Sequence, residues 1–157
     1  MHTKVVVANQ AEARFYDIEG PRAALRLVGQ LANPDARLHD RDLKSDRPGR
    51  VFTSARSGAS RRGAVARHAT GGERRPRRQA AATFARRVAA ELIAAKRDHG
   101  FDRLVLLVAP AFLGILRKAI PKTMQSDIAA EVAKDLLNQT EKEMRAHIPR
   151  HALQTLR

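Results

Sequence analysis

Arginine is the residue type in this sequence that most clearly indicates chemistry. Twelve arginines and one acid, Glu73, lie between Arg47 and Arg87, so this segment carries +11 of the chain's net charge of +14. The planar guanidinium group binds phosphate and stacks on bases. This density of charge indicates a polyanionic partner, nucleic acid first and an anionic membrane second, and the alternative is a solvated basic loop. The candidate RNA-binding residues are Arg61, Arg62, Arg67, Arg74, Arg75, Arg77, Arg78, Arg86 and Arg87.

Other catalytic side chains lack the spacing that their chemistry needs. A two-metal nuclease holds its ions about 4 Å apart with clustered carboxylates. The first expected strand, residues 4–8, contains no acid, and Asp17 and Asp102 have no evident way to converge. The six histidines form no HxH or HExxH motif, and no serine lies in a GxSxG elbow. We therefore expect no nuclease centre, no metal and no cofactor.

Three short strands are predicted at the N-terminus from their β-branched residues and their period of two. They cover residues 4–8, 13–18 and 24–31 and form an antiparallel meander. From Asp35 to Arg78 the sequence has no sustained apolar period, and a segment of this length is uncommon inside a compact domain unless it is functional or disordered. We expect residues 35–78 to form a mobile arginine-rich loop that becomes ordered on a partner.

The second half of the sequence alternates helical and strand patterns. Gln79–Asp98 has apolar residues at helical spacing, and Leu104–Ala109 is a continuous apolar run, as in a strand that is covered on both faces. Pro110–Ala119 is a second helix. Ser126–Leu137 fits a helix or a strand equally well. Thr140–Glu143 is a capping box that begins a last helix, which ends near Ile148.

The length of 157 residues is typical of one domain. We assign residues 1–149 to a single α/β domain and residues 150–157 to a C-terminal tail. The chain has no cysteine, which fits a reducing compartment. It also has no apolar run of the length that a signal peptide or a membrane span needs, so we expect a cytoplasmic protein.

Four segments resemble, in order and spacing, the sequences of the host-attachment protein family. They are VVVANQAEARFYD at Val5–Asp17, FARRVAAEL at Phe84–Leu92, LVLLVAPAFLGILRK at Leu104–Lys118 and AEVAKDLLNQTEKEMRAHI at Ala130–Ile148. The family is regarded as a bacterial relative of the central, catalytic domain of the archaeo-eukaryotic peptide release factors. The resemblance implies that Ile128–Lys134 is a strand, and the element order is then that of a ribonuclease-H-like mixed sheet with a long basic loop before the first long helix.

The resemblance also draws attention to Gly71, Gly72 and Glu73. In release factors a mobile loop before the long helix carries Gly-Gly-Gln and helps water to attack the peptidyl-tRNA ester. This chain has Glu73 in the third place, which adds a negative charge near RNA and lacks an amide donor. The three residues are therefore candidate catalytic residues, and the alternative is a Gly-Gly turn in a flexible loop.

Two further features each permit two interpretations. Arg14 matches the Ala-Arg pair of the family, and it is either functional or part of a salt bridge at a strand edge. Pro110–Gly114 opens a helix that could receive an anion at its N-terminus, but packing also explains Phe112 and Leu113.

The leading hypothesis is a non-enzymatic RNA- or ribosome-binding domain, similar to the release-factor domain, that uses the arginine-rich segment to contact phosphates. The first alternative is peptidyl-tRNA hydrolysis in ribosome rescue through Gly71–Glu73. The second is an indirect role in attachment to host cells. The sequence does not fix the oligomeric state.

Overall fold

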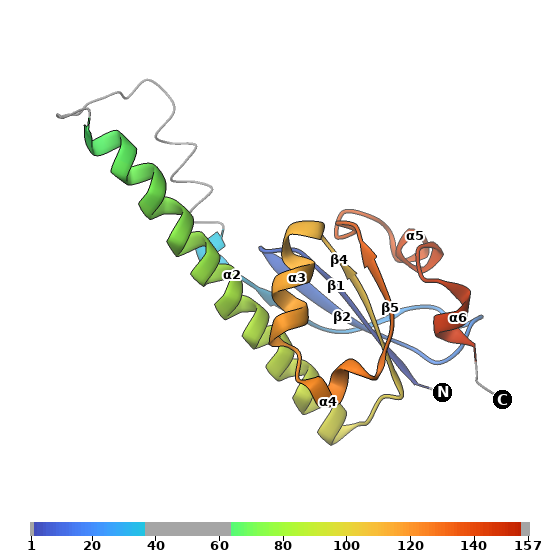
Figure 1. The fold of residues 1–157 in the computed structure, drawn as a ribbon. Coiled ribbons are helices and arrows are strands. Elements are labelled where there is room, and N and C mark those ends of the chain that lie inside the picture. The colour runs from blue at the N-terminus through green and yellow to red at the C-terminus, as the bar shows by residue number, and fades with distance from the viewer. Residues whose placement is uncertain (1, 37–63, 155–157) are drawn as a thin grey trace. The chain divides into compact units, whose positions relative to one another are not determined.

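The structure is a computed structural model that describes residues 2–36 and 64–154, with residues 64–77 described by their backbone alone. Strands and helices alternate after an N-terminal group of three strands (Figure 1). The elements are β1 (Thr3–Ala8), β2 (Glu12–Ile18), β3 (Arg26–Ala32), α2 (Ala64–Asp98), β4 (Arg103–Val108), α3 (Pro110–Ala119), α4 (Lys122–Gln125), β5 (Ile128–Ala133), α5 (Glu141–Ala146) and α6 (Arg150–Leu153).

The five strands form one mixed sheet in the order β3-β2-β1-β4-β5. β2 is antiparallel to both β1 and β3, which confirms the predicted meander, and β4 is parallel to β1 and to β5. The predicted element at Ile128 is a strand, as the family resemblance implied, although its residues also fit a helix. This strand, β5, lies at the edge of the sheet and pairs with β4. Its sequence fits the helical and the strand period equally well, and the pairing with β4 favours the strand.

The hairpin between β1 and β2 is fixed by Asn9. Its side-chain oxygen accepts hydrogen bonds from the backbone N–H groups of Ala11 and Glu12, at 2.8 and 3.0 Å, and its own N–H donates to the carbonyl of Glu12. This local bonding is the usual reason for Asn at a turn. It sets the register in which Ala8 faces Ala13 and Lys4 faces Asp17.

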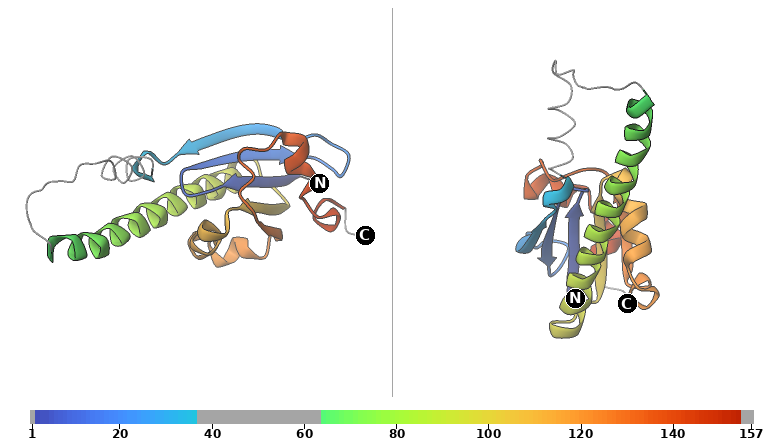
Figure 2. Two further views of the ribbon diagram at one scale, coloured as in Figure 1. Left: turned by 90° about the horizontal axis from the view of Figure 1, so that it is seen from above. Right: turned by 90° about the vertical axis from the view of Figure 1, so that its left-hand side faces the viewer.

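β1 and β4 are buried along their whole length because the sheet is covered on both faces. Residues of α2 from Ala82 onward and α3 cover one face, while α5 and α6 cover the other (Figures 1 and 2). On the first face the rings of Phe84 and Phe112 lie 5.8 Å apart between their centroids. The continuous apolar run at Leu104 is therefore confirmed as a strand that is buried on both faces of the sheet.

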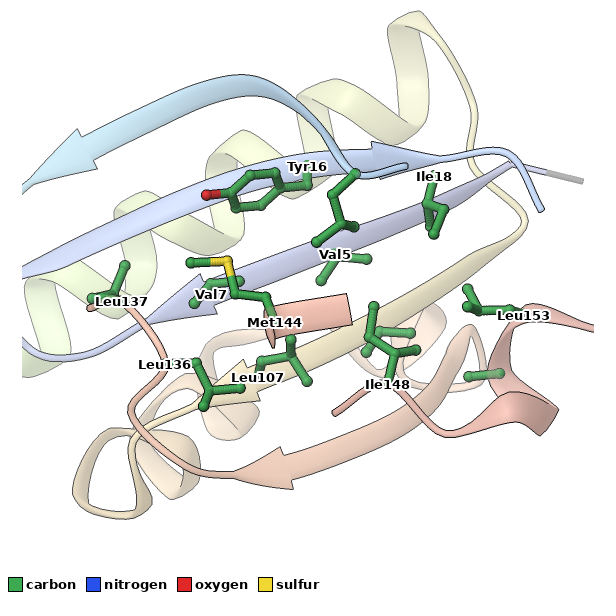
Figure 3. Close-up of a cluster of buried hydrophobic side chains, with 13 residues drawn as sticks. Val5, Val7, Tyr16, Ile18, Leu107, Leu136, Leu137, Met144, Ile148 and Leu153 are labelled. Atoms are coloured by element: carbon green, nitrogen blue, oxygen red, sulfur yellow. The ribbon is translucent and has the colours of Figure 1, made fainter. Parts of the chain in front are cut away.

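The second face holds a cluster of buried side chains from the sheet and from the C-terminal segment (Figure 3). Tyr16, Val5 and Leu107 contribute from the strands, and Met144 and Ile148 contribute from α5 and the turn that follows it. The Thr140 hydroxyl accepts a hydrogen bond from the Glu143 N–H at 3.1 Å, which confirms the predicted cap and fixes where α5 begins.

Helix α2 begins at Ala64, whereas the hydrophobic pattern predicted its start at Gln79. The last part of the expected loop 35–78 is therefore helical, and residues 37–63 lie outside the described part of the chain. Periodicity detects a helix by its apolar stripe, and residues 64–78 have none. Alanine and arginine have high helix propensity, but the same segment contains Gly71, Gly72 and Pro76, which disfavour a helix interior. Propensity therefore does not explain the helical backbone of this segment.

The chain divides into two compact units. One consists of Met1–Ala32 with Ala82–Arg157 and contains the sheet, and the other is Asn33–Ala81, which covers most of the arginine-rich segment. In the described ranges, 2–36 and 64–154, no helix is both long enough and apolar enough to cross a bilayer.

Residues 150–153 differ from the expected tail because they form α6, whose Ala152 and Leu153 are buried. The carbonyls of His151 and Ala152 accept hydrogen bonds from the buried guanidinium of Arg103, at 3.1 and 3.0 Å. Residues 155–157 lie outside the described part of the chain. α6 is thus a component of the second apolar layer.

This packing predicts that Leu153→Ala lowers the free energy of unfolding by about 2–4 kcal/mol, since truncating a buried leucine removes apolar packing and leaves a cavity. Leu27→Ala is the matched control, because Leu27 is 47% exposed, and its effect should stay within about 0.5 kcal/mol. Urea unfolding measures both variants. Equal, small effects would mean that the C-terminal segment does not pack on the sheet.

Candidate functional site

The candidate RNA-binding arginines fall into three groups. Arg61 and Arg62 lie outside the described residues, and Arg67, Arg74, Arg75 and Arg77 lie on α2, where the backbone alone is described. The side chains of Arg78, Arg86 and Arg87 are described, and all three are exposed.

Two of these exposed arginines already have protein partners. The Arg87 guanidinium donates to the carbonyl of Ala32 at 3.2 Å and lies 5.7 Å from the centre of the Phe84 ring. Arg86 donates to the Thr83 hydroxyl at 3.1 Å. The contacts of Arg87 link α2 to the end of β3, so part of the basic charge at the C-terminal end of the segment serves the fold.

Gly71, Gly72 and Glu73 lie inside α2, between Ala64 and Asp98, and not in a loop before the helix. The sequence pattern misplaced them because two adjacent glycines are usually a turn signal. Their backbone is therefore helical, in place of the mobile loop that was expected to carry them. The residue four positions after Gly72 is Pro76, which has no N–H group to donate to the Gly72 carbonyl.

The helical spacing of the arginines follows the spacing of the buried residues. Ala81, Ala85, Val88 and Leu92 are buried at alternating steps of four and three residues. The same steps, counted toward the N-terminus, reach Arg78, Arg74, Gly71 and Arg67. One heptad-like stripe of α2 thus changes in sequence from alanine, valine and leucine to arginine and glycine at Arg78.

A second candidate site is a hollow of about 490 Å³ in the sheet-containing unit. It lies between the first three strands and the C-terminal end of α2, and we call it the β3–α2 groove. Directly opposed residues of β1, β2 and β3 form a charged row, Lys4, Asp17 and Arg26, along its floor. The residues that line it are His2, Lys4, Phe15, Asp17, Arg26, Val28, Gly29, Glu91, Ala94, Ala95, Asp98 and His99.

Asp17 is the centre of this row. Its Oδ1 atom lies 2.6 Å from Lys4 Nζ and 3.0 Å from His2 Nε2, and its Oδ2 atom lies 3.4 Å from the Arg26 guanidinium. Burial acts to raise the pKa of Asp17, but the hydrogen bonds and charges of Lys4 and His2 outweigh burial and hold the pKa below its ordinary value of 3.8. Asp17 is therefore a carboxylate whose negative charge is stabilised by Lys4 and His2 and balances the charge of the buried Lys4.

His2 contacts both of the acids that the sequence analysis considered. Its ring nitrogen Nε2 lies 3.0 Å from Asp17 Oδ1, its other ring nitrogen lies 3.0 Å from the carbonyl of Gly100, and its backbone N–H donates to Asp102 Oδ2 at 2.9 Å. Asp17 and Asp102 thus bind different parts of His2. Within the described ranges, however, no three His, Cys, Asp or Glu side chains are placed to hold a metal ion.

The two features with open interpretations are both explained by structure. Arg14 forms a salt bridge with Glu12 at 2.7 Å and donates to the carbonyl of Leu137 at 3.3 Å, and the hydrogen bond to Glu12 raises the pKa of Arg14. Phe112 and Leu113 are buried, so packing accounts for the start of α3.

Sequence reasoning missed the groove because its floor comes from three strands and its wall from the end of a distant helix. One signal was present. A hairpin whose turn begins at Asn9 places Lys4 opposite Asp17, and a buried lysine is rare unless an acid pairs with it.

The fold and these sites define a mixed α/β protein with a five-stranded sheet and a strongly basic segment whose C-terminal part lies in the long helix α2. The family model described as "Protein required for attachment to host cells" matches residues 4–148. The chain therefore belongs to the host-attachment family. None of the curated proteins matches it.

The environment of Asp17 predicts a pH-dependent contribution to stability. At neutral pH Asp17→Asn leaves Lys4 buried without its counterion and should cost about 3 kcal/mol. Because the pKa of Asp17 is lowered on folding, its contribution is complete above 3.8 and is lost as the pH falls through the lower folded value. Chemical unfolding of wild type and variant across this range should show their difference shrinking in acid, and a constant difference would contradict the assignment.

Proposed function

We propose that this member of the host-attachment family is an RNA- or ribosome-binding protein of the cytoplasm that acts without catalysis. The observation that carries the proposal is the change of residue type along one stripe of α2. Arginine replaces the buried alanine, valine and leucine of the stripe at positions 78, 74 and 67. An arginine cannot enter an apolar core without a partner for its charge.

The arrangement of charge supports a polyanion as this partner. Arg78, Arg74 and Arg67 recur at steps of four and seven residues along the helical backbone, and a guanidinium group is suited to a phosphate. Binding of this kind depends on the backbone of the nucleic acid more than on its bases. The few aromatic residues of the chain, five Phe and one Tyr, agree with phosphate contact in preference to base stacking.

The sheet supports a ribonuclease-H-like assignment, and with it the relation to the release-factor domain. Its order is β3-β2-β1-β4-β5, and β2 runs against the other four strands. This order follows from the meander, the return through α2 to pair β4 with β1, and the return through α3 to β5. The ribonuclease-H-like assignment is part of the proposal. It concerns the fold, and one fold can carry different functions.

Peptidyl-tRNA hydrolysis through Gly71–Glu73 is the weaker alternative. Those residues lie in a helical segment, and the third position is an acid where the release factors have glutamine. The attachment to host cells that gives the family its description is then an indirect consequence of RNA or ribosome binding.

The first test replaces Arg74, Arg75, Arg77 and Arg78 with glutamine, which keeps a high helix propensity. We expect RNA affinity to fall by at least about tenfold at low salt. The slope of log affinity against log salt should flatten by about 0.7 for each phosphate that the variant no longer neutralises. Co-sedimentation with ribosomes and titration of a single-stranded RNA, each at several salt concentrations, measure the two effects.

The matched control removes the same charge elsewhere by replacing Arg22, Lys118, Lys122 and Lys142 with glutamine. This variant should keep most of the affinity and the slope. Equal losses in both variants would show attraction by net charge alone, and a salt-independent complex would exclude phosphate binding.

The second test is Gly72→Ala. Alanine in a helix interior is more stable than glycine by about 0.8 kcal/mol, so we expect a higher helix content by circular dichroism and unchanged RNA binding. Peptidyl-tRNA on stalled ribosomes should remain intact with wild type and variant alike. Release by the wild type that disappears in the variant would instead establish the hydrolytic alternative.

A further inference from the structure

The β3–α2 groove offers cationic hydrogen-bond donors on its strand side. Lys4 is 5% exposed and lines the groove. An ammonium group has three donors, and the acceptor that the described residues supply to Lys4 Nζ is Asp17 Oδ1 at 2.6 Å. Donors of Lys4 thus remain for a ligand. Arg26 lies next in the row, with its side chain 69% exposed and only a long contact of 3.4 Å to Asp17.

The helix side of the groove is acidic. Glu91 and Asp98 line it from α2. Asp98 pairs with Arg97 at 3.1 Å, while Glu91 contacts no cation among the residues that the structure describes. The C-terminal end of a helix also carries partial negative charge. A ligand in the groove therefore meets positive charge from β1 and β3 and negative charge from α2.

Space for a ligand is provided by Val28 and Gly29. The register between β2 and β3 shifts between Phe15 and Tyr16, so Val28 has no cross-strand partner and lines the groove as the extra residue of a bulge. A Cβ atom at Gly29 would meet one atom within 4 Å, Phe15 Cδ2 at 3.9 Å. A glycine inside a strand often marks a place where a ligand comes close.

The signs of these charges select the class of ligand. Lys4 and Arg26 share the single acid Asp17, so the strand side carries one positive charge in excess, and on α2 Asp98 is paired with Arg97, which leaves Glu91. A nucleotide would bring two negative charges to a groove with one excess cation and would place them near Glu91, which costs free energy. From this geometry we infer that the groove binds a zwitterionic amino acid or dipeptide, whose carboxylate contacts Lys4 and Arg26 and whose ammonium group contacts Glu91. The volume of about 490 Å³ lies within the range of small-molecule sites. The inference is independent of the RNA-binding proposal.

The test titrates the full-length protein with the standard L-α-amino acids and with dialanine, each one separately, by calorimetry. For the best-bound compound, the N-acetyl and methyl ester derivatives remove one charge each. We expect each derivative to bind at least about tenfold more weakly than the zwitterion, because each one leaves a charged group without its partner. AMP is included as a nucleotide probe.

Three variants locate the binding. Arg26→Gln and Glu91→Gln alter exposed side chains, so they should fold normally and each weaken the zwitterion about tenfold. In Glu91→Gln the zwitterion should no longer bind more tightly than its N-acetyl derivative. In Arg26→Gln the zwitterion should no longer bind more tightly than its methyl ester. Gly29→Val narrows the groove without changing charge and should weaken binding. Arg22→Gln and Glu141→Gln, exposed and outside the groove, should bind as the wild type does.

Binding of AMP in preference to every amino acid would overturn the inference and assign the groove to nucleotides. Absence of binding by all amino acids and by dialanine would also overturn it. Zwitterion binding that is as tight in Gly29→Val as in the wild type would place the ligand elsewhere on the protein and reject the groove.

Discussion

The burial of β1 and β4 between two apolar layers is the constraint on which the rest of the structure depends. Both strands are buried from end to end, so every residue of β1 must find a neighbour on one face or the other. Valines meet this requirement by packing. Lys4 cannot, and its position one residue into the strand requires an acid at the opposed position of β2, which is Asp17. The charged row of the groove therefore follows from the same burial that builds the core.

The same constraint separates the two kinds of positive charge in the chain. Several arginines of the sheet-containing unit have partners within the unit. Arg14 pairs with Glu12, Arg117 forms a two-point contact with Glu131 at 2.7 and 3.1 Å, and Arg103 is held by two carbonyls. The arginine-rich segment has one acid for twelve arginines, so internal pairing cannot neutralise it. We propose that an external polyanion balances this concentrated surplus.

The parts of the fold that could be predicted are those with a strong local signal. The apolar run of β4, the proline that opens α3 and the Thr140 cap each specify one element, and each lies where the sequence placed it. β5 required the family resemblance, because Ile128 and Val132 fit two periods. The start of α2 was missed because residues 64–78 have no apolar stripe and contain Gly71, Gly72 and Pro76, which are turn signals. The candidate sites differ in the same way. The arginine-rich segment is visible in the composition alone, whereas Arg26 and Glu91 line one hollow only through the bulge of β3 and the packing of α2.

The buried Lys4–Asp17 pair also has a consequence for the fidelity of folding. A slip of one residue between β1 and β2 would separate the two charges and turn one strand's alternate side chains to the wrong face. The lysine would then lie in an apolar layer without a counterion, at a cost of several kcal/mol. An all-apolar hairpin of valines and alanines tolerates such a slip far more easily. The ion pair thus destabilises misaligned hairpins and favours the one register in which Lys4 lies opposite Asp17.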